Sequence, residues 1–549
     1  ADPVMLSRAR PQRLSLGILW RSLTQQAAIK TQTYKIETYG CQMNVSDSEM
    51  VASILNTAGL KEAPDVNAAD AVFLNTCAIR EGAEGKVWAR LDQLRSQKLK
   101  RRKQNPLVVG VLGCMAERLK HKLLESDKLV DIVVGPDAYR DLPKLLSEVE
   151  DGAPSAINVQ LSLEETYADI TPVRAAKNRV SAFVSIMRGC NNMCSYCVVP
   201  FTRGRERSRD AATIVAEVES LAAQGFKEVI LLGQNVNSYL DKSTSSTWDA
   251  DRVRDATSFT TPAFTQISRR KHVDDGVTFA ELIDAVAAAV PEVRVRFTSP
   301  HPKDFPMELL RVMARHPNVC NSVHLPAQSG STAILQAMRR GYTRQDYLDA
   351  VTAIRRQLPN VSLSSDFISG FCGETEQDHR DTLSLVDQVG YDTGFFFAYS
   401  ERPKTFGFHK LTDDIPEQVK LTRLKELADR HLEICAERNR HEVGKRHLVL
   451  IEKQAHRDAD KWAGRSDCNR RVVFPKEALP WQTTGMSLAE PVPGDYVEVL
   501  IEDTTSKSLR GRAIARWSLV DYYNNPQPTQ YPDDTAQHHT VSAIAGATV

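Results

Sequence analysis

The first third of the chain alternates short apolar runs with longer stretches of helical periodicity. The strand-like runs are Lys35–Thr38, Ala71–Leu74, Leu107–Leu112 and Asp131–Val134. Between the first two we expect a helix from about Ser48, capped by Ser46 or Asp47. Strands that alternate with helices predict a parallel, doubly wound sheet over residues 33–150.

The middle of the chain repeats the strand–helix alternation. Its apolar runs are Ala182–Met187, Glu228–Leu232, Val293–Phe297, Ser322–Leu325, Ser362–Ile368 and Gly394–Ala398. Amphipathic helical stretches separate these runs. Six strand–helix units predict an open (βα)6 partial barrel over residues 175–440.

From Arg446 onward the pattern changes to short strands without helices between them. These strands are Leu448–Glu452, Arg471–Phe474, Tyr496–Ile501 and Leu509–Ala515. They predict a small β-barrel over residues 445–519. The predicted fold class is therefore α/β, with a doubly wound N-terminal sheet, a central partial barrel and a C-terminal small β-barrel.

Three segments do not fit this pattern. Ala1-Asp2-Pro3 reads as an expression remnant, and no acidic residue follows until after Tyr34, while arginines punctuate leucines and a tryptophan. This composition over residues 1–32 favours a mitochondrial targeting sequence over a disordered basic tail. Residues 241–276 and 520–549 are polar with little apolar periodicity, and we expect both to be disordered.

Composition excludes several classes of protein. Among 549 residues, 42% are hydrophobic and 25% are charged, as in ordinary globular proteins, and no apolar stretch is long enough to span a membrane. The net charge is +1, so a nucleic-acid partner must be bound by local basic patches. Ten cysteines in so long a chain do not indicate a disulfide scaffold.

Three cysteines follow three predicted strands of the first sheet. Cys41, Cys77 and Cys114 come after the first, second and third strands. Because the carboxyl ends of parallel strands line one ligand crevice, the three thiols are expected to meet there. The alternative is three unrelated buried cysteines. Their shared position favours a metal or cluster site.

A compact cysteine motif follows the first strand of the predicted barrel. Cys190, Cys194 and Cys197 form a C-x3-C-x2-C loop. Three thiolates can hold a 4Fe–4S cluster and leave its fourth iron open for a small molecule. Zinc is the alternative, but it requires a fourth ligand, and no further cysteine or histidine follows nearby.

Polar motifs follow several other barrel strands. Each could be a strand-to-helix turn with a helix cap, but active sites of barrels lie at this face. We therefore expect a cofactor-facing role for Gly233, Gln234, Asn235, Ser299, Gln328 and Ser329. No chemistry is assigned to His301 or His324, since single histidines are more often structural.

The two sets of cysteines, with their flanking residues, resemble the radical S-adenosylmethionine methylthiotransferases of tRNA, the MiaB type. The matching strings are Thr38–Asn44, Asn75–Arg80, Gly113–Ala116, Arg188–Gly204, Gly233–Asn237 and His324–Ser331. The likeness extends over about residues 33–519. Asp366–Thr375 and Ser299–Lys303 resemble the eukaryotic mitochondrial branch, the cyclin-dependent-kinase regulatory-subunit-associated proteins, which implies a mitochondrial (matrix) location.

The resemblance implies a reaction at carbon 2 of N6-isopentenyladenosine, beside the anticodon of tRNA, which gains a methylthio group. It implies two 4Fe–4S clusters, with S-adenosylmethionine as radical source at Cys190, Cys194 and Cys197, and as methyl donor for sulfur carried at Cys41, Cys77 and Cys114. It also implies that the C-terminal domain is a TRAM domain that binds RNA. A reducing protein such as a ferredoxin or flavoprotein is expected, the sulfur donor is unknown, and a monomer is the default.

Candidate phosphate contacts are Arg203, Arg205, Arg465, Arg470, Arg471 and Arg510. The alternative for each is a solvated surface charge. Cys320, Cys372, Cys435 and Cys468 are expected to be packing residues. Two other functions stay open: methylthiolation of threonylcarbamoyladenosine tRNA or of a ribosomal protein, and a non-catalytic, partner-binding regulator.

Overall fold

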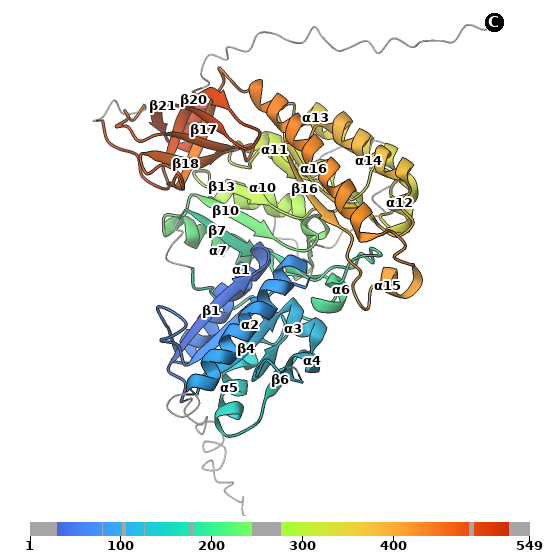
Figure 1. Cartoon of the computed structure of the whole chain (residues 1–549). Helices are drawn as coiled ribbons and strands as arrows, with labels where there is room; N and C mark the ends of the chain where they lie inside the picture. Colours follow the sequence, from blue (N-terminus) through green and yellow to red (C-terminus); the bar gives the residue numbers. More distant parts are fainter. Residues whose placement is uncertain are drawn as a thin grey trace, which may run out of the picture.

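The computed structural model consists of three units (Figure 1) and describes residues 30–78, 81–101, 106–125, 127–165, 167–174, 180–243, 276–482 and 488–525. The N-terminal sheet domain lies at one end, the partial barrel in the middle and the small β-barrel at the other end. Most of the predicted targeting sequence, of the polar insertion and of the C-terminal tail lies outside the described residues. Within the described part, no helix has both the length and the apolar character to cross a bilayer.

The N-terminal domain is a six-stranded parallel sheet with helices on both faces. Its strands, in spatial order, are β2 (Lys61–Glu62), β1 (Thr33–Tyr39), β3 (Ala71–Thr76), β4 (Val108–Gly113), β5 (Ile132–Val134) and β6 (Ala156–Asn158). One core packs α1 (Gln42–Thr57) and α5 (Leu142–Glu150) on the sheet, and a second core packs α2 (Glu81–Arg101) and α3 (Cys114–Leu119) on the other face. The predicted doubly wound sheet is confirmed.

The middle domain is a parallel barrel built in two halves. The first half orders β13 (Arg294–Phe297), β10 (Glu228–Leu232) and β7 (Ser181–Ser185), and the second orders β14 (Ser322–His324), β15 (Ser362–Ser369) and β16 (Thr393–Ala398). A single parallel bridge between Val295 and Val319 joins the halves. The helices around them are α7 (Ala211–Ala223), α10 (Phe279–Ala289), α11 (Met307–Arg315), α13 (Arg344–Gln357), α14 (Glu376–Val389) and α16 (Glu417–Arg440). The six predicted strands are therefore all present.

The C-terminal domain is a closed barrel of five strands, in which all neighbouring pairs but one are antiparallel. They are β17 (Arg446–Gln454), β18 (Lys461–Ser466), β19 (Arg471–Pro475), β21 (Leu509–Trp517) and β20 (Tyr496–Thr504). The sequence did not predict β18, because Gly464 interrupts its apolar alternation. In the structure that glycine lets two strands approach, since a Cβ there would lie 2.1 Å from the carbonyl oxygen of Leu450.

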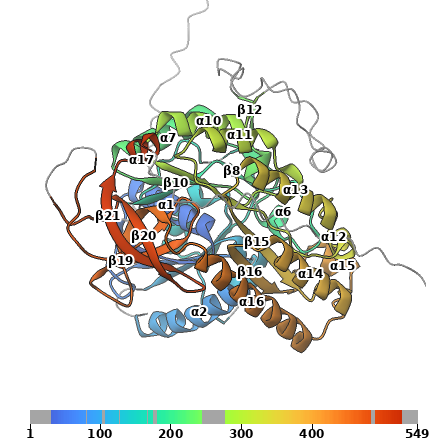
Figure 2. The same ribbon diagram turned by 90° about the horizontal axis from the view of Figure 1, so that it is seen from above.

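The small barrel docks on the amino-terminal ends of the middle strands, beside α16 (Figure 2). Arg294 donates to the carbonyl oxygens of Arg465 and Leu448, at 2.7 and 2.6 Å. The Tyr496 hydroxyl donates to the Lys227 carbonyl, directly before β10, at 2.7 Å. The N-terminal domain instead meets the carboxyl end of β7, so the two outer domains lie at opposite ends of the barrel strands.

Several predicted boundaries are wrong. The first helix, α1, starts at Gln42 and not at Ser48, because Cys41 is its N-cap. The tail expected to be disordered from residue 520 begins with α17 (Leu519–Asn524), which Ser518 caps and which packs on Trp517. Asp241, assigned to the polar insertion, belongs to β11 (Leu240–Asp241), which pairs with β12 (Val277–Thr278). Lys30 and Thr31, assigned to the leader, are hydrogen-bonded to Glu150.

Candidate functional site

The first cysteine set lies at the carboxyl edge of the N-terminal sheet. Cys41 follows β1, Cys77 follows β3, and Cys114 follows β4, and these are three adjacent strands. The chain order reverses between β1 and β3, which is where open sheets bind ligands. Gly113 permits the approach, because its φ is +86° and a Cβ there would lie 2.5 Å from Asn75 Oδ1.

The three thiols influence one another, as neighbouring ligands would. A hydrogen bond from Cys77 and the charge of Arg203 lower the pKa of Cys41 to about 6, against the opposing effect of burial. Burial raises the pKa of Cys114, which is 3% exposed. Cys41 also caps the N-terminus of a 16-residue helix, a position that favours a thiolate. The set can therefore offer three sulfur ligands to one metal group.

The second cysteine set occupies a tight loop after β7. The loop closes where the Cys190 amide donates to the Gly204 carbonyl at 3.2 Å. Gly189 has a φ of +76°, and a Cβ there would lie 2.0 Å from the Arg205 carbonyl oxygen, so only glycine fits. Burial raises the pKa of Cys190 to about 12, with Cys194 adding to the effect. Loading a metal group on this loop must therefore displace protons.

Two side chains to which the sequence analysis assigned no chemistry contact the Cys194 sulfur. Arg340 Nη1 lies 3.4 Å from Cys194 Sγ, and His301 Nε2 lies 3.9 Å from it. Arg340 follows α12 (Thr332–Ala337) and has no distinguishing motif around it. His301 stands in a Ser-Pro-His-Pro string after β13, which marked the region but not the chemistry of the residue.

His301 is a hydrogen-bond donor toward this loop and not a fourth ligand. Its Nδ1 accepts a hydrogen bond from the Lys303 amide at 3.1 Å, so the proton of the neutral ring is on Nε2. Burial, with the charge of Arg340, holds the pKa of His301 well below its usual range, which keeps the ring neutral. The Nε2 proton therefore points to sulfur, and the lone pair that a metal would need is engaged elsewhere.

The residues after Cys197 bring the two cysteine sets together. The short helix α6 (Val199–Thr202) starts directly beyond the loop, and Val198 packs on Ala78 and Cys114 of the first set. Arg203, the next residue after this helix, donates from Nε to Cys114 Sγ at 3.2 Å. The two sets therefore lie on either side of one short segment of chain.

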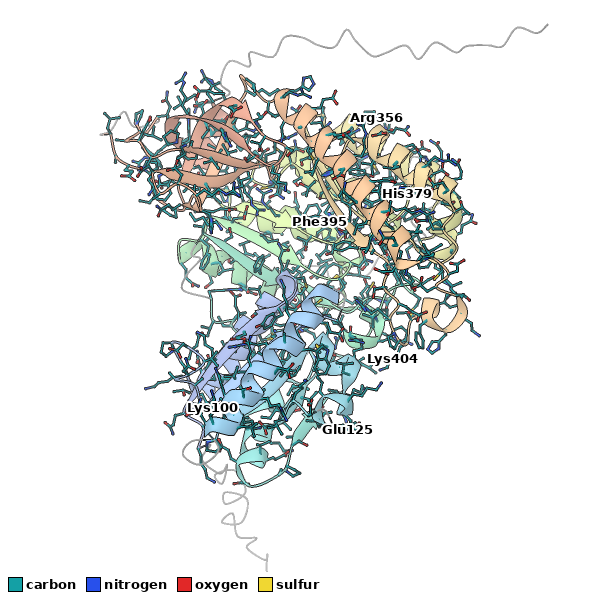
Figure 3. All side chains as sticks on the ribbon, in the orientation of Figure 1. Lys100, Glu125, Arg356, His379, Phe395 and Lys404 are labelled. Atoms are coloured by element: carbon teal, nitrogen blue, oxygen red, sulfur yellow. The ribbon has the colours of Figure 1, made fainter. Side chains whose placement is uncertain are left out.

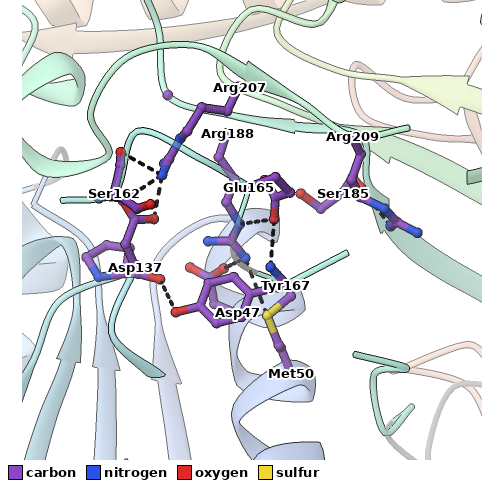
Figure 4. A network of polar contacts seen from close by, with 12 residues as sticks. Asp47, Met50, Asp137, Ser162, Glu165, Tyr167, Ser185, Arg188, Arg207 and Arg209 are labelled. Carbon is purple, nitrogen blue, oxygen red and sulfur yellow. Dashed lines mark hydrogen bonds and ion pairs between the residues drawn. The ribbon is translucent and has the colours of Figure 1, made fainter. Parts of the chain in front are cut away.

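A buried ion network fixes this junction (Figure 4). Asp47 accepts hydrogen bonds from Arg203 Nη2 at 2.7 Å and from Arg188 Nη2 at 3.0 Å. Arg188 also stacks 4.6 Å from the centre of the Tyr167 ring, and Arg207 pairs with Asp137 at 2.9 Å. The two arginines hold the pKa of Asp47 below its usual value even though burial opposes this.

Of the residues predicted to face a cofactor, Gln234 and Asn235 lie beside the second set, and most of the six already have protein partners. The Gln234 side-chain oxygen accepts from the Gly189 amide at 2.5 Å, and Asn235 holds the His301 amide at 3.2 Å. Ser299 and Gln328 both have positive φ, 62° and 72°, which is strained for these residues and is common at functional sites. Gly233 packs on Met187, and Ser329 accepts from the Ser331 amide at 3.2 Å.

Models of three known families match the chain in the order of its three domains. They are the uncharacterized protein family UPF0004 at residues 33–135, the radical SAM superfamily at residues 184–386, and the TRAM domain at residues 440–514. The first two span the two cysteine sets. The third spans most of the closed barrel.

Relatives of known family match most of this chain. The mitochondrial tRNA methylthiotransferase CDK5RAP1 of Mus musculus is 51% identical over 88% of this chain and 82% of its own length. This chain belongs to the tRNA methylthiotransferase family. The tRNA-2-methylthio-N(6)-dimethylallyladenosine synthase of Chloroherpeton thalassium is 48% identical over 88% of this chain and 96% of its own. Membership of the methylthiotransferase family, predicted from the motifs, is confirmed.

Among solved structures, one match is the radical S-adenosylmethionine methyltransferase TsrM of Kitasatospora setae. It is 16% identical to this methylthiotransferase chain, with a TM-score of 0.46, and the match covers 69% of this chain and 77% of TsrM.

The arginines predicted to contact RNA divide into two groups. Arg205, Arg465, Arg471 and Arg510 are exposed. Arg203 is only 3% exposed and binds Asp47 and Cys114, and Arg470 pairs with Asp392 at 2.5 Å. Arg203 is therefore an interior residue, and Arg470 is half-buried. The tertiary contacts of the domains bury Arg203 and partly bury Arg470, which their local sequence did not reveal.

A cavity of about 400 Å³ lies between the small barrel and the starts of β15 and β16. The two cysteine sets lie at the other end of the barrel strands. The lining of the cavity includes Phe395, which is 42% exposed (Figure 3), and several arginines of the small barrel. Nearby, ligand atoms of His447, Asp467 and Cys468 lie within 4.8 Å of one another. Arg470 lies against the same thiol, and its cation opposes a metal ion there, so we assign no metal to this group.

Proposed function

We propose that this protein is a radical S-adenosylmethionine methylthiotransferase that converts N6-isopentenyladenosine, next to the anticodon of mitochondrial tRNA, to its 2-methylthio derivative. The observation that carries the proposal is the pair of cysteine sets on either side of α6. One set is built on the sheet and the other on the barrel, yet Val198 and Arg203 of the barrel segment contact Cys114 of the sheet. A sulfur donor and a radical source must be neighbours in such a reaction.

The side chains present fit two 4Fe–4S clusters. Each site offers three sulfur atoms, and the geometry of His301 keeps it from acting as a fourth ligand to the loop. When bound, these clusters and S-adenosylmethionine supply the radical and the methylated sulfur. The protein contributes ligands, donors to sulfur such as Arg340, and exclusion of water, since four of the six cysteines are less than 9% exposed.

Two residue sets remain candidates for binding the cofactor and the RNA. We propose that the S-adenosylmethionine site is shaped by residues that follow β10, β13 and β14, namely Gly233, Gln234, Asn235, Ser299, Gln328 and Ser329. Arg205, Arg465, Arg471 and Arg510 are proposed phosphate contacts. Because the small barrel and the clusters lie at opposite ends of the barrel strands, the TRAM domain would hold the body of the tRNA while the anticodon loop reaches the clusters.

Mass spectrometry of nucleosides tests the substrate. Anaerobically reconstituted protein is incubated with dithionite, S-adenosylmethionine and tRNA that carries either isopentenyladenosine or threonylcarbamoyladenosine. We expect the 2-methylthio product only with the isopentenyl tRNA. Product only with the threonylcarbamoyl tRNA, or none with either from protein that has both clusters, would overturn the assignment.

The tRNA contacts have their own measurement. Arg471→Ala is expected to weaken tRNA binding and to reduce the slope of log K against log salt by about 0.9, since one phosphate contact is lost. Arg356→Ala, a change of an exposed arginine on α13 outside the small barrel (Figure 3), is the matched control and is expected to leave the slope unchanged. An unchanged slope for Arg471→Ala would remove this residue from the RNA surface.

The setting of the reaction is proposed from the same family. The relatives named mitochondrial support a mitochondrial location for this chain, and we propose the matrix, where mitochondrial tRNA is found. A ferredoxin or flavoprotein is proposed as the reductant, and a monomer as the working unit.

A further inference from the structure

Arg203 joins the barrel segment to a cysteine of the sheet domain by a hydrogen bond. It leaves α6 six residues after Cys197 and reaches Cys114. The guanidinium uses Nε for the Cys114 sulfur, at 3.2 Å, and Nη2 for Asp47, at 2.7 Å. Its third nitrogen, Nη1, is buried and has no hydrogen-bond partner among the described residues.

An unpartnered nitrogen on a buried guanidinium is costly unless a ligand supplies the missing acceptor. The ligand proposed next to Arg203 is the auxiliary cluster on Cys41, Cys77 and Cys114. The role of Arg203 inferred below rests on that proposal. A cluster held by three thiolates carries sulfur acceptors and a net negative charge. Both properties match the donor that Nη1 leaves unsatisfied.

The other groups facing Arg203 define its charge balance. Asp47 lies between Arg203 and Arg188, so a single buried carboxylate is shared by two cations. Tyr139 contributes a hydroxyl to Asp47 at 3.3 Å. Glu165, 3.8 Å from Arg188 Nε, is the second carboxylate of the network and lies on the side of Arg188, so Asp47 is the one carboxylate among the described residues that pairs with Arg203.

We propose that Arg203 is a positioning residue for the auxiliary cluster. Its guanidinium donates hydrogen bonds to the cluster's sulfur atoms, including one from Nε to the Cys114 sulfur, and these hydrogen bonds raise the reduction potential of the cluster. Hydrogen bonds to coordinating sulfur stabilise the reduced, more negative state, and they are a principal determinant of cluster potential. Through the Arg203 side chain, the segment that follows Cys197 in the barrel domain changes the reduction potential of the cluster on the sheet domain.

The test measures the auxiliary cluster alone. In the full-length chain, Cys190→Ala, Cys194→Ala and Cys197→Ala together remove the second cluster site. Arg203→Met and Arg203→Lys are then introduced separately, and the midpoint potential is followed by electron paramagnetic resonance during an anaerobic titration. Arg188→Met is the matched control, because Arg188 is equally buried and pairs with the same carboxylate but has no contact with a cysteine.

For Arg203→Met we expect the reduction equilibrium of the cluster to fall at least tenfold, which is about 59 mV for one electron. Arg203→Lys keeps the charge and is expected to recover part of this shift, and Arg188→Met is expected to change the potential less than half as far. If Arg203→Met fails to fold, the comparison of Arg203→Lys with Arg188→Lys decides the question.

The outcomes separate this inference from the proposed function. Equal potentials for the Arg203 and Arg188 variants, with four irons retained, would overturn the role of Arg203 and leave the auxiliary cluster in place. A parent variant that assembles no cluster on Cys41, Cys77 and Cys114 would overturn both.

Discussion

Arg296 joins the middle domain to the small β-barrel. Its guanidinium pairs with Glu228 at 2.6 Å and donates to the carbonyl oxygens of Ser466 and Asp467, at 2.7 and 2.8 Å. Glu228 is 3% exposed, and the charge of Arg296 holds its pKa below the usual value against the effect of burial. Arg296→Met therefore leaves a buried carboxylate with its nearest cation removed.

Breaking a buried ion pair from one side costs about 3–5 kcal/mol. At about 1.4 kcal/mol per factor of ten, the equilibrium for opening this interface should rise by roughly two to nearly four orders of magnitude. Hydrogen exchange followed by mass spectrometry on peptides from β18 and β19 measures that opening directly. Peptides from the N-terminal sheet should be unchanged, because they lie at the other end of the molecule.

Two further variants make the reasoning refutable. Arg510→Met breaks the pair with Asp503, in which both side chains are more than half exposed. It should change the free energy of opening, measured by hydrogen exchange, by less than about 1 kcal/mol. Adding Glu228→Gln to Arg296→Met should restore part of the protection, because it removes the unpaired charge. If the double variant opens more readily than Arg296→Met, the cost does not arise from the stranded carboxylate.

Three other predictions follow from particular residues. Gly189→Ala should abolish iron loading of the loop, since its Cβ would meet a carbonyl oxygen at 2.0 Å, whereas Gly225→Ala, at φ +93° with open space around it, should load normally. Cys41→Ala should lower the iron content from about eight to about four per chain, and Cys372→Ser should leave it unchanged. Although burial lowers the pKa of His447, hydrogen bonds to neighbouring side chains raise it to about 9. Its stabilising contribution is then complete below about pH 6.5 and is lost as the pH rises through 9, so the thermal stability of the wild-type protein should fall over that window more than that of His447→Gln.

Local spacing was sufficient to locate the six cysteines and the strands before them. An apolar run followed within a few residues by a cysteine can be recognised without the rest of the chain, and parallel strands bring their carboxyl ends to one edge by topology alone. The strand β18 was missed for the opposite reason. Its side of the barrel is closed by the backbone approach at Gly464, and a close approach leaves no apolar alternation to recognise.

Charged side chains were the least predictable part of the site. Arg203 and Arg205 stand two positions apart in one basic string, yet the first is buried against Asp47 and the second is exposed. Asp47, which with Ser46 was a candidate N-cap, is instead a buried counterion within α1. Whether a charged side chain here is exposed or buried depends on which residues of the neighbouring domain pack against it.

The sequence alone predicted three domains, two cysteine sets and the family to which the chain belongs, because each cysteine stands a few residues after a recognisable strand or beside another cysteine. Only the tertiary structure decided that the two sets flank α6, that His301 and Arg340 donate to sulfur, and that Arg203 faces inward. These contacts join residues more than 80 positions apart, and hydrogen bonds over such separations are fixed by the packing of one domain on another.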